Sequence, residues 1–80
     1  AKPRGQLKII EEILTVALEG ASKTQLVYRT NLNFKSIRRY LPILLERGLI
    51  ALKESPITTY VTTDKGKDFL SHYRKVRKLL

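Results

Sequence analysis

Four polar side chains lie at the start of a helix that the sequence predicts over residues 34–47. Lys35, Ser36, Arg38 and Arg39 occupy its first turn and a half. An arginine can donate two hydrogen bonds to the O6 and N7 atoms of guanine, and a serine can bond to any base. The major groove of B-DNA, about 12 Å wide, accepts one helix. We therefore predict that these four residues contact DNA bases.

A second set of residues could contact the phosphate backbone, which accepts hydrogen bonds from lysine, arginine and threonine. Three lie on a helix predicted over residues 23–29 and three lie around a predicted hairpin. The set comprises Lys23, Thr24, Arg29, Lys53, Thr58 and Thr59. Because the hairpin contributes a single lysine, it could equally serve as a structural cover for the core. A solvated basic face without a ligand is a further alternative.

The overall charge favours a polyanionic partner. The 80 residues include 16 Lys and Arg against 7 Asp and Glu, which gives a formal net charge of +9. Residues 20–48 hold six basic residues against Glu46 alone, and residues 63–80 hold six against Asp64 and Asp68. The excess charge is thus concentrated in two blocks, and nucleic acid is the leading candidate partner.

The sequence gives little support for catalysis. It contains no cysteine and one histidine, His72, which we expect at the surface. Disulfides, thiolate nucleophiles and the usual zinc sites are therefore excluded, and no phosphate-binding glycine motif occurs. We expect no enzyme activity, no metal and no cofactor. No apolar segment follows Ala1-Lys2-Pro3-Arg4, so we expect no secretory signal, and the lack of cysteine fits an intracellular protein.

Local signals divide the chain into four helices and one hairpin within a single domain, residues 1–80. Apolar spacing predicts helices over about 5–19, 23–29, 34–47 and 64–79. Ser22, Asn33 and Thr63 are placed to cap the last three of them. Residues rich in β-branched and aromatic side chains predict a hairpin over about 49–62. The fold class is α+β, and the second and third helices form a helix-turn-helix.

The last predicted helix carries an apolar stripe. Its members are four, three and four residues apart, as in a coiled coil: Phe69, Tyr73, Val76 and Leu80. A stripe of this size usually marks an interface. The helix could fold back onto the first helix of its own chain or pair with its copy in a second chain. We predict a homodimer in which Ile9 and Val16 of the first helix add to the interface.

Several short motifs resemble those of archaeal winged-helix proteins, in particular the small, basic, chromatin-type DNA-binding proteins and related transcription regulators. The motifs are Leu7-Lys8-Ile9-Ile10, Lys23-Thr24, Tyr28, Asn31-Leu32, Arg39-Tyr40-Leu41, Gly48-Leu49-Ile50 and Tyr60-Val61-Thr62-Thr63-Asp64-Lys65-Gly66. The resemblance covers about residues 5–78. It implies a winged helix-turn-helix fold, binding of double-stranded DNA by the third helix and the wing, and dimerisation through the C-terminal helix. A cytoplasmic, nucleoid-associated protein is expected.

Two other functions remain open at this level. The same fold could be a protein-interaction module that uses an exposed Ile43 and an edge formed by Leu70 and Leu79. It could also bind RNA or associate with the ribosome. The sequence does not distinguish activation, repression and DNA packaging, and it does not give a target site.

Overall fold

Polar side chains begin three of the helices at the predicted positions. In the computed structural model, which describes residues 5–80, Ser22 and Gln25 form a reciprocal capping box. The Asn33 side chain accepts a hydrogen bond from the N–H of Ser36 at 2.8 Å, and Thr63 caps the last helix in the same way. Each cap satisfies an N–H group that lacks a partner within the helix. Residues 1–4, on which the expected absence of a secretory signal rests, lie outside the described residues.

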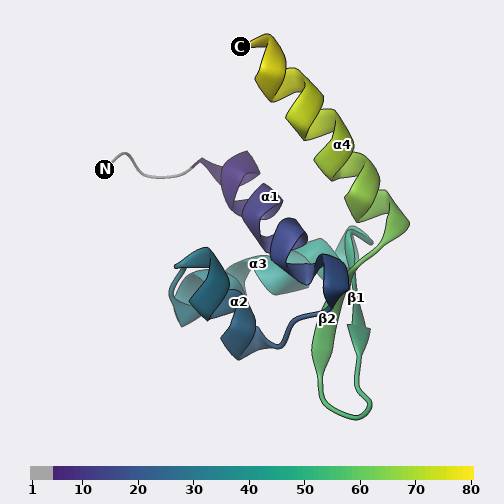
Figure 1. The fold of residues 1–80 in the computed structure, drawn as a ribbon. Helices are drawn as coiled ribbons and strands as arrows, with labels where there is room; N and C mark the ends of the chain where they lie inside the picture. Colours follow the sequence, from purple (N-terminus) through teal and green to yellow (C-terminus); the bar gives the residue numbers. More distant parts are fainter. Residues whose placement is uncertain (1–4) are drawn as a thin grey trace.

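The order of elements is that of a winged helix (Figure 1). The elements are α1 (Gln6–Val16), a 3₁₀ turn η1 (Ala17–Glu19), α2 (Lys23–Thr30), α3 (Phe34–Glu46), β1 (Ile50–Lys53), β2 (Thr59–Thr62) and α4 (Asp64–Leu79). The predicted α+β class with four helices and a two-stranded hairpin is therefore confirmed. The first helix differs in detail, since its last turn tightens into the 3₁₀ form.

The turn between α2 and α3 depends on one left-handed residue. Asn31 has φ 59° and ψ 19°, a conformation that asparagine tolerates better than most residues. Leu32, in the same turn, is buried, and the Thr30 hydroxyl donates to the Leu26 carbonyl at 2.6 Å. The buried Leu32 side chain and the Thr30 hydrogen bond hold this turn in place, and the turn sets the direction of α3 relative to α2.

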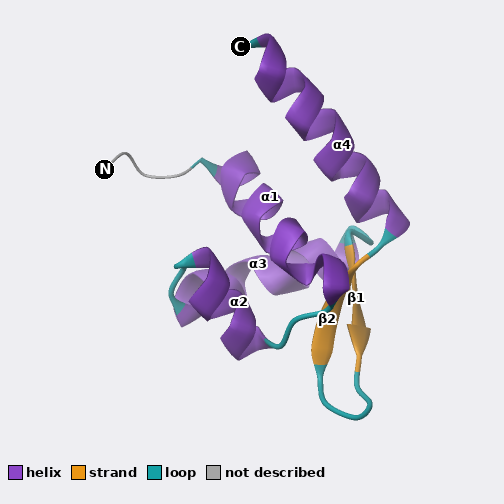
Figure 2. Cartoon of the chain, viewed as in Figure 1, coloured by secondary structure: helices purple, strands orange, loops and turns teal. Residues whose placement is uncertain are grey.

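The wing is a two-stranded antiparallel hairpin that extends from the helices (Figure 2). Ile50 pairs with Thr62 at the base of the wing, and Lys53 pairs with Thr59 next to the loop. Ala21, just after η1, adds an isolated bridge to Tyr60 with hydrogen bonds of 3.0 and 2.7 Å. The buried hydroxyl of Thr62 donates to the Leu14 carbonyl at 2.7 Å. These contacts attach the base of the wing to α1 and η1.

The core lies where α1, α2 and α3 meet the base of the wing. Its largest fully buried side chains are Ile13, Leu14, Leu26, Ile37 and Leu44. Leu70 of α4 joins this core with 3% of its surface exposed. The expected interaction edge containing Leu70 is therefore wrong, because this side chain fills the interior of its own chain.

α4 packs on the rest of the domain from its start to about Arg74. Gly66 approaches β1 and β2 so closely that an added Cβ would overlap the Leu49 carbonyl oxygen and lie 2.6 Å from the Thr62 methyl group. The end of α4 points away from the other elements (Figure 1), and Val76 and Leu80 are exposed.

None of the helices within residues 5–80 is both long and apolar enough to cross a membrane.

Candidate nucleic-acid interface

α3 presents the predicted base-contacting residues on its outer side. Lys35, Arg38 and Arg39 are exposed, and Ser36 is half-buried. At 100° per residue, all four lie about 100° or more around the helix from Ile37, which is fully buried. Within residues 5–80, no ion pair shorter than 4.0 Å involves these three cations. Three positive charges on one helix face are therefore available to an anionic ligand.

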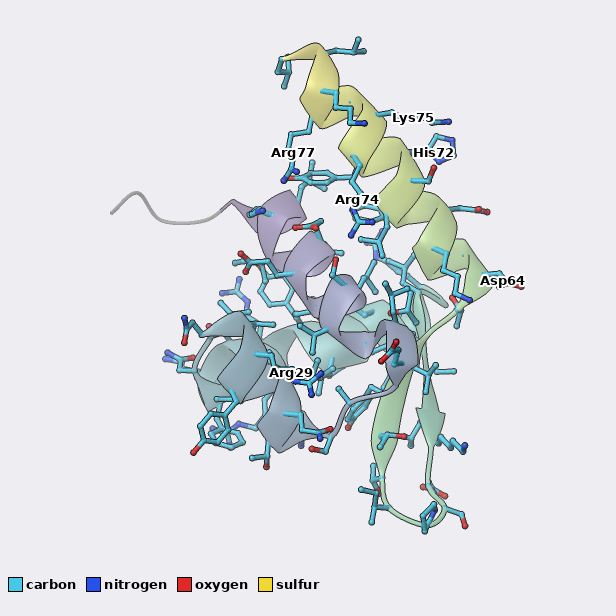
Figure 3. All side chains as sticks on the ribbon, in the orientation of Figure 1. Arg29, Asp64, His72, Arg74, Lys75 and Arg77 are labelled. Carbon is cyan, nitrogen blue, oxygen red and sulfur yellow. The ribbon has the colours of Figure 1, made fainter. Side chains whose placement is uncertain are left out.

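The predicted phosphate contacts on α2 separate into two groups. Lys23 and Thr24 are exposed in its first turn. Arg29 instead lies between α2 and the end of α1 (Figure 3), where it lines a shallow hollow together with Glu11 and Glu12. Arg29 is itself exposed, so it stays a predicted phosphate contact, with two acidic residues beside it.

The wing also offers fewer contacts than its predicted set. Lys53 and Thr58 are exposed. Thr59 is half-buried, and its hydroxyl oxygen faces the backbone of Gly20, 4.0 Å from where a Cβ would stand. The loop between the strands carries Ile57, which is 63% exposed, and no basic residue. Of the predicted wing contacts, one cation and one hydroxyl, Lys53 and Thr58, are therefore exposed.

The predicted dimer stripe on α4 is only partly free. Phe69 and Tyr73 are half-buried and stack with their ring centroids 6.0 Å apart. Phe69 also packs against the core, whereas Val76 is 57% exposed and Leu80 is fully exposed. The unpartnered apolar surface is therefore at the end of the helix.

Ile9 and Val16 do not continue this stripe. Both are partly buried against the core of their own chain. Val16 lines the hollow next to Arg29 and Thr30 of α2, and Ile9, seven residues earlier, lies on the same side of α1. The expected contribution of these two residues to an interface with α4 is therefore corrected, because α4 contacts a different side of α1.

The side of α1 that meets α4 contains a polar cluster that sequence analysis did not identify. Glu11 is buried, accepts a hydrogen bond from the Thr15 hydroxyl at 3.2 Å, and pairs with Lys8 at 3.2 Å. Arg74 reaches this cluster from α4 (Figure 3), 3.7 Å from the Glu11 carboxylate and 3.1 Å from the Thr15 hydroxyl. Lys8, Glu11 and Thr15 share one face by their spacing, but the sequence does not show which element covers that face.

The part of the chain that the structure describes contains no group of three His, Cys, Asp or Glu side chains arranged to hold a metal. His72 is exposed and points away from α1 (Figure 3), with Nδ1 2.7 Å from the Asp68 carbonyl oxygen. The arrangement is suited to binding an anionic ligand on α3.

The fold and this exposed basic helix define a winged helix-turn-helix protein. The family model described as winged helix-turn-helix matches residues 3–80, and the chain belongs to that family. Among solved structures it is similar to Sso10a-2, a DNA-binding protein from Sulfolobus solfataricus, with a TM-score of 0.85 and 26% sequence identity. The match covers 95% of this chain and 81% of that one. No sequence among the curated proteins matches the chain.

Proposed function

We propose that this protein binds double-stranded DNA by inserting α3 into the major groove. The observation that carries the proposal is the set of three exposed cations, Lys35, Arg38 and Arg39, without ion-pair partners in the described chain. Sso10a-2, to which the whole fold is similar, is itself a DNA-binding protein. DNA binding explains the basic face of α3 better than solvation alone. A face that only contacts water does not require three unpaired positive charges close together on one helix.

Each side chain has a role that its chemistry suits. Arg38 and Arg39 can each donate two parallel hydrogen bonds to guanine, and Lys35 and Ser36 can bond to a base edge or a nearby phosphate. Lys23 and Thr24, exposed at the start of α2, would contact phosphates, as would Lys53 and Thr58 on the wing. Arg29 would contact phosphate as well, since it is exposed, whereas Thr59 is left out because its hydroxyl oxygen faces the backbone of Gly20.

We further propose that two copies associate through the end of α4. Val76, Leu79 and Leu80 form an exposed apolar surface at the end of α4, which no other element within residues 5–80 covers. Such a surface on a 9.2 kDa chain favours association. A two-fold dimer would present two α3 helices to DNA and would increase the number of phosphate contacts.

The biological role would be that of a transcription regulator or a nucleoid-associated packaging protein. The two roles differ in sequence dependence, which a footprint on genomic DNA would measure. A discrete protected site would identify a regulator, and uniform protection would identify a packaging protein. Either outcome would require DNA binding and would not need a cofactor.

Two variants of equal charge test whether α3 is the binding element. Lys35→Ala with Arg38→Ala removes two charges from α3, and Lys75→Ala with Lys78→Ala removes two from the end of α4. We expect the α3 variant to lose duplex affinity by at least about tenfold more than the α4 variant at the same salt concentration. Equal losses would mean that overall charge, and not α3, determines binding.

A further inference from the structure

A groove that the proposed DNA contacts do not explain lies between the start of α1, the middle of α3 and the start of α4. Its volume is about 480 Å³, within the range of about 300 to 1,000 Å³ that is typical of sites for small molecules. Leu7 and Ile10 form one wall, Ile43 forms the second, and Phe69 forms the third. Leu7 is 57% exposed and Ile43 is 40% exposed. The groove thus exposes apolar surface from three elements at one place.

The rim of this groove is basic. Arg39, Arg47 and Lys65 are among its lining residues, and no lining residue is acidic. Lys65 donates to the Arg47 carbonyl oxygen at 2.7 Å, so part of its hydrogen-bonding capacity is used at the end of α3. Within residues 5–80, neither Arg39 nor Arg47 has an ion-pair partner at 4.0 Å or less. Two guanidinium groups are therefore available beside the apolar walls of the groove.

We propose that the groove binds a small apolar molecule that carries one carboxylate. The apolar part would cover Leu7, Ile43 and Phe69, since burial of apolar surface is favourable. The carboxylate would accept hydrogen bonds from both Arg39 and Arg47, since arginine binds carboxylates through charge-assisted hydrogen bonds. Charge complementarity selects an anion over a neutral or cationic molecule.

The same charges argue against a second copy of the chain as the occupant. The exposed apolar end of α4 is surrounded by basic residues, including Lys75, Arg77 and Lys78. Its insertion would bring these cations close to Arg39, Arg47 and Lys65, which like-charge repulsion disfavours. A single small anion fits both the size and the charge of the groove.

Occupation of the groove would affect DNA binding, and this part of the inference rests on the proposed function. Arg39 lines the groove and also belongs to the basic face of α3. A carboxylate bound to Arg39 would take the hydrogen-bond donors that guanine needs, so the ligand and DNA would oppose each other. By thermodynamic linkage, DNA would weaken ligand binding by the same factor.

The experiment titrates the isotope-labelled protein with octanoate and follows backbone amide shifts by NMR, without DNA. We expect saturable shifts around Leu7, Ile43 and Phe69, and much weaker binding of octan-1-ol and octylammonium. Arg47→Ala should weaken octanoate binding by about tenfold, as expected for loss of a charged hydrogen bond. Arg38→Ala is the matched control, because Arg38 does not line the groove, and it should leave octanoate binding unchanged.

A second pair of variants tests the apolar walls of the groove. Leu7→Asp should abolish octanoate binding, whereas Leu52→Asp, at an exposed position on the wing, should not. Circular dichroism checks that both variants fold. Non-saturable shifts, equal binding of octan-1-ol, or equal behaviour of Arg47→Ala and Arg38→Ala would overturn the proposed site.

Duplex binding with and without saturating octanoate tests the link to DNA. A several-fold loss of DNA affinity in octanoate, absent in the Leu7→Asp variant, would support the link. The link would be overturned if the affinity for duplex DNA is unchanged while the NMR shifts show that octanoate occupies the groove. If no duplex binds even without octanoate, the proposed function fails, and the NMR titration still decides whether the groove is a ligand site.

Discussion

Arg74 of α4 lies 3.7 Å from the buried carboxylate of Glu11 in α1. The same guanidinium donates to the Thr15 hydroxyl at 3.1 Å, one turn further along α1. Glu11 also pairs with Lys8, so two cations and one hydroxyl surround it. This cluster fixes the side of α1 on which α4 rests, and with it the direction in which the free end of α4 points.

Replacement of Arg74 should therefore destabilise the domain. Arg74→Ala leaves a mostly buried carboxylate with one cation fewer, and we expect a loss of about 1 kcal/mol in the free energy of unfolding, since Arg74 itself is half exposed. Lys75, which points away from α1 (Figure 3), provides the control, and Lys75→Ala should change stability by less than about 0.5 kcal/mol. Urea denaturation measures both, and equal values would argue against the cluster.

Gly66 should not tolerate a side chain. A Cβ at this position would overlap the Leu49 carbonyl oxygen and would lie 2.6 Å from the Thr62 methyl group, so α4 would have to move away from the wing. We expect Gly66→Ala to cost about 1 to 3 kcal/mol of stability. Gly5 has no atom within 4 Å of a Cβ, so Gly5→Ala should cost less than about 1 kcal/mol, the effect of alanine at the N-cap of α1. Thermal unfolding that does not separate the two variants would contradict this close approach.

Sequence reasoning succeeded where the signal is local. Ser22, Asn33 and Thr63 cap helices through contacts within three residues, and Asn31 marks the left-handed turn by its own side-chain chemistry. The starts of α2, α3 and α4 follow from such contacts, whereas the first predicted helix ends in a 3₁₀ turn that its sequence did not indicate.

Sequence reasoning was less successful where the outcome depends on which elements meet. Leu70 has the same apolar character as Leu79, but only Leu70 lies where α4 enters the core. Arg29 belongs to a basic block in the sequence, but the sequence does not show that the packing of α2 on α1 brings it to a hollow that Glu11 and Glu12 also line. Helical periodicity shows on which face of a helix a residue lies, but not which other element covers that face. The groove bordered by Arg39 could not be predicted for the same reason.

Arg39 and Lys23 should differ in their effect on sequence preference. Arg39→Ala removes a donor suited to guanine, so we expect a loss of about 1 to 3 kcal/mol on the preferred site and a relaxed preference at one base pair. Lys23→Ala removes a phosphate contact and should weaken all duplexes alike. Competition binding over a randomised set of duplexes measures both. Equal, sequence-independent losses would indicate a packaging protein.

Charge placed on the free end of α4 should separate the proposed dimer. Val76 is exposed in the single chain, so Val76→Glu should leave the fold intact but place a carboxylate in the apolar contact between two copies. We expect a monomer with weaker DNA binding, measured by analytical ultracentrifugation. Ser71→Glu, at an exposed position of α4 off the apolar stripe, adds the same single charge and is the control. A wild-type monomer at high micromolar concentration would refute the dimer and leave the winged-helix fold unaffected.

The salt dependence of duplex binding tests the central claim most directly. A dimer that uses α3, the start of α2 and the wing should contact on the order of 6 to 10 phosphates, and each contact contributes a slope of about −0.9 to the plot of log K against log salt concentration. We predict tight binding at low salt and a slope of about −5 to −9. A slope near zero, or no duplex binding at low salt, would contradict the assignment of this protein as a DNA-binding winged helix.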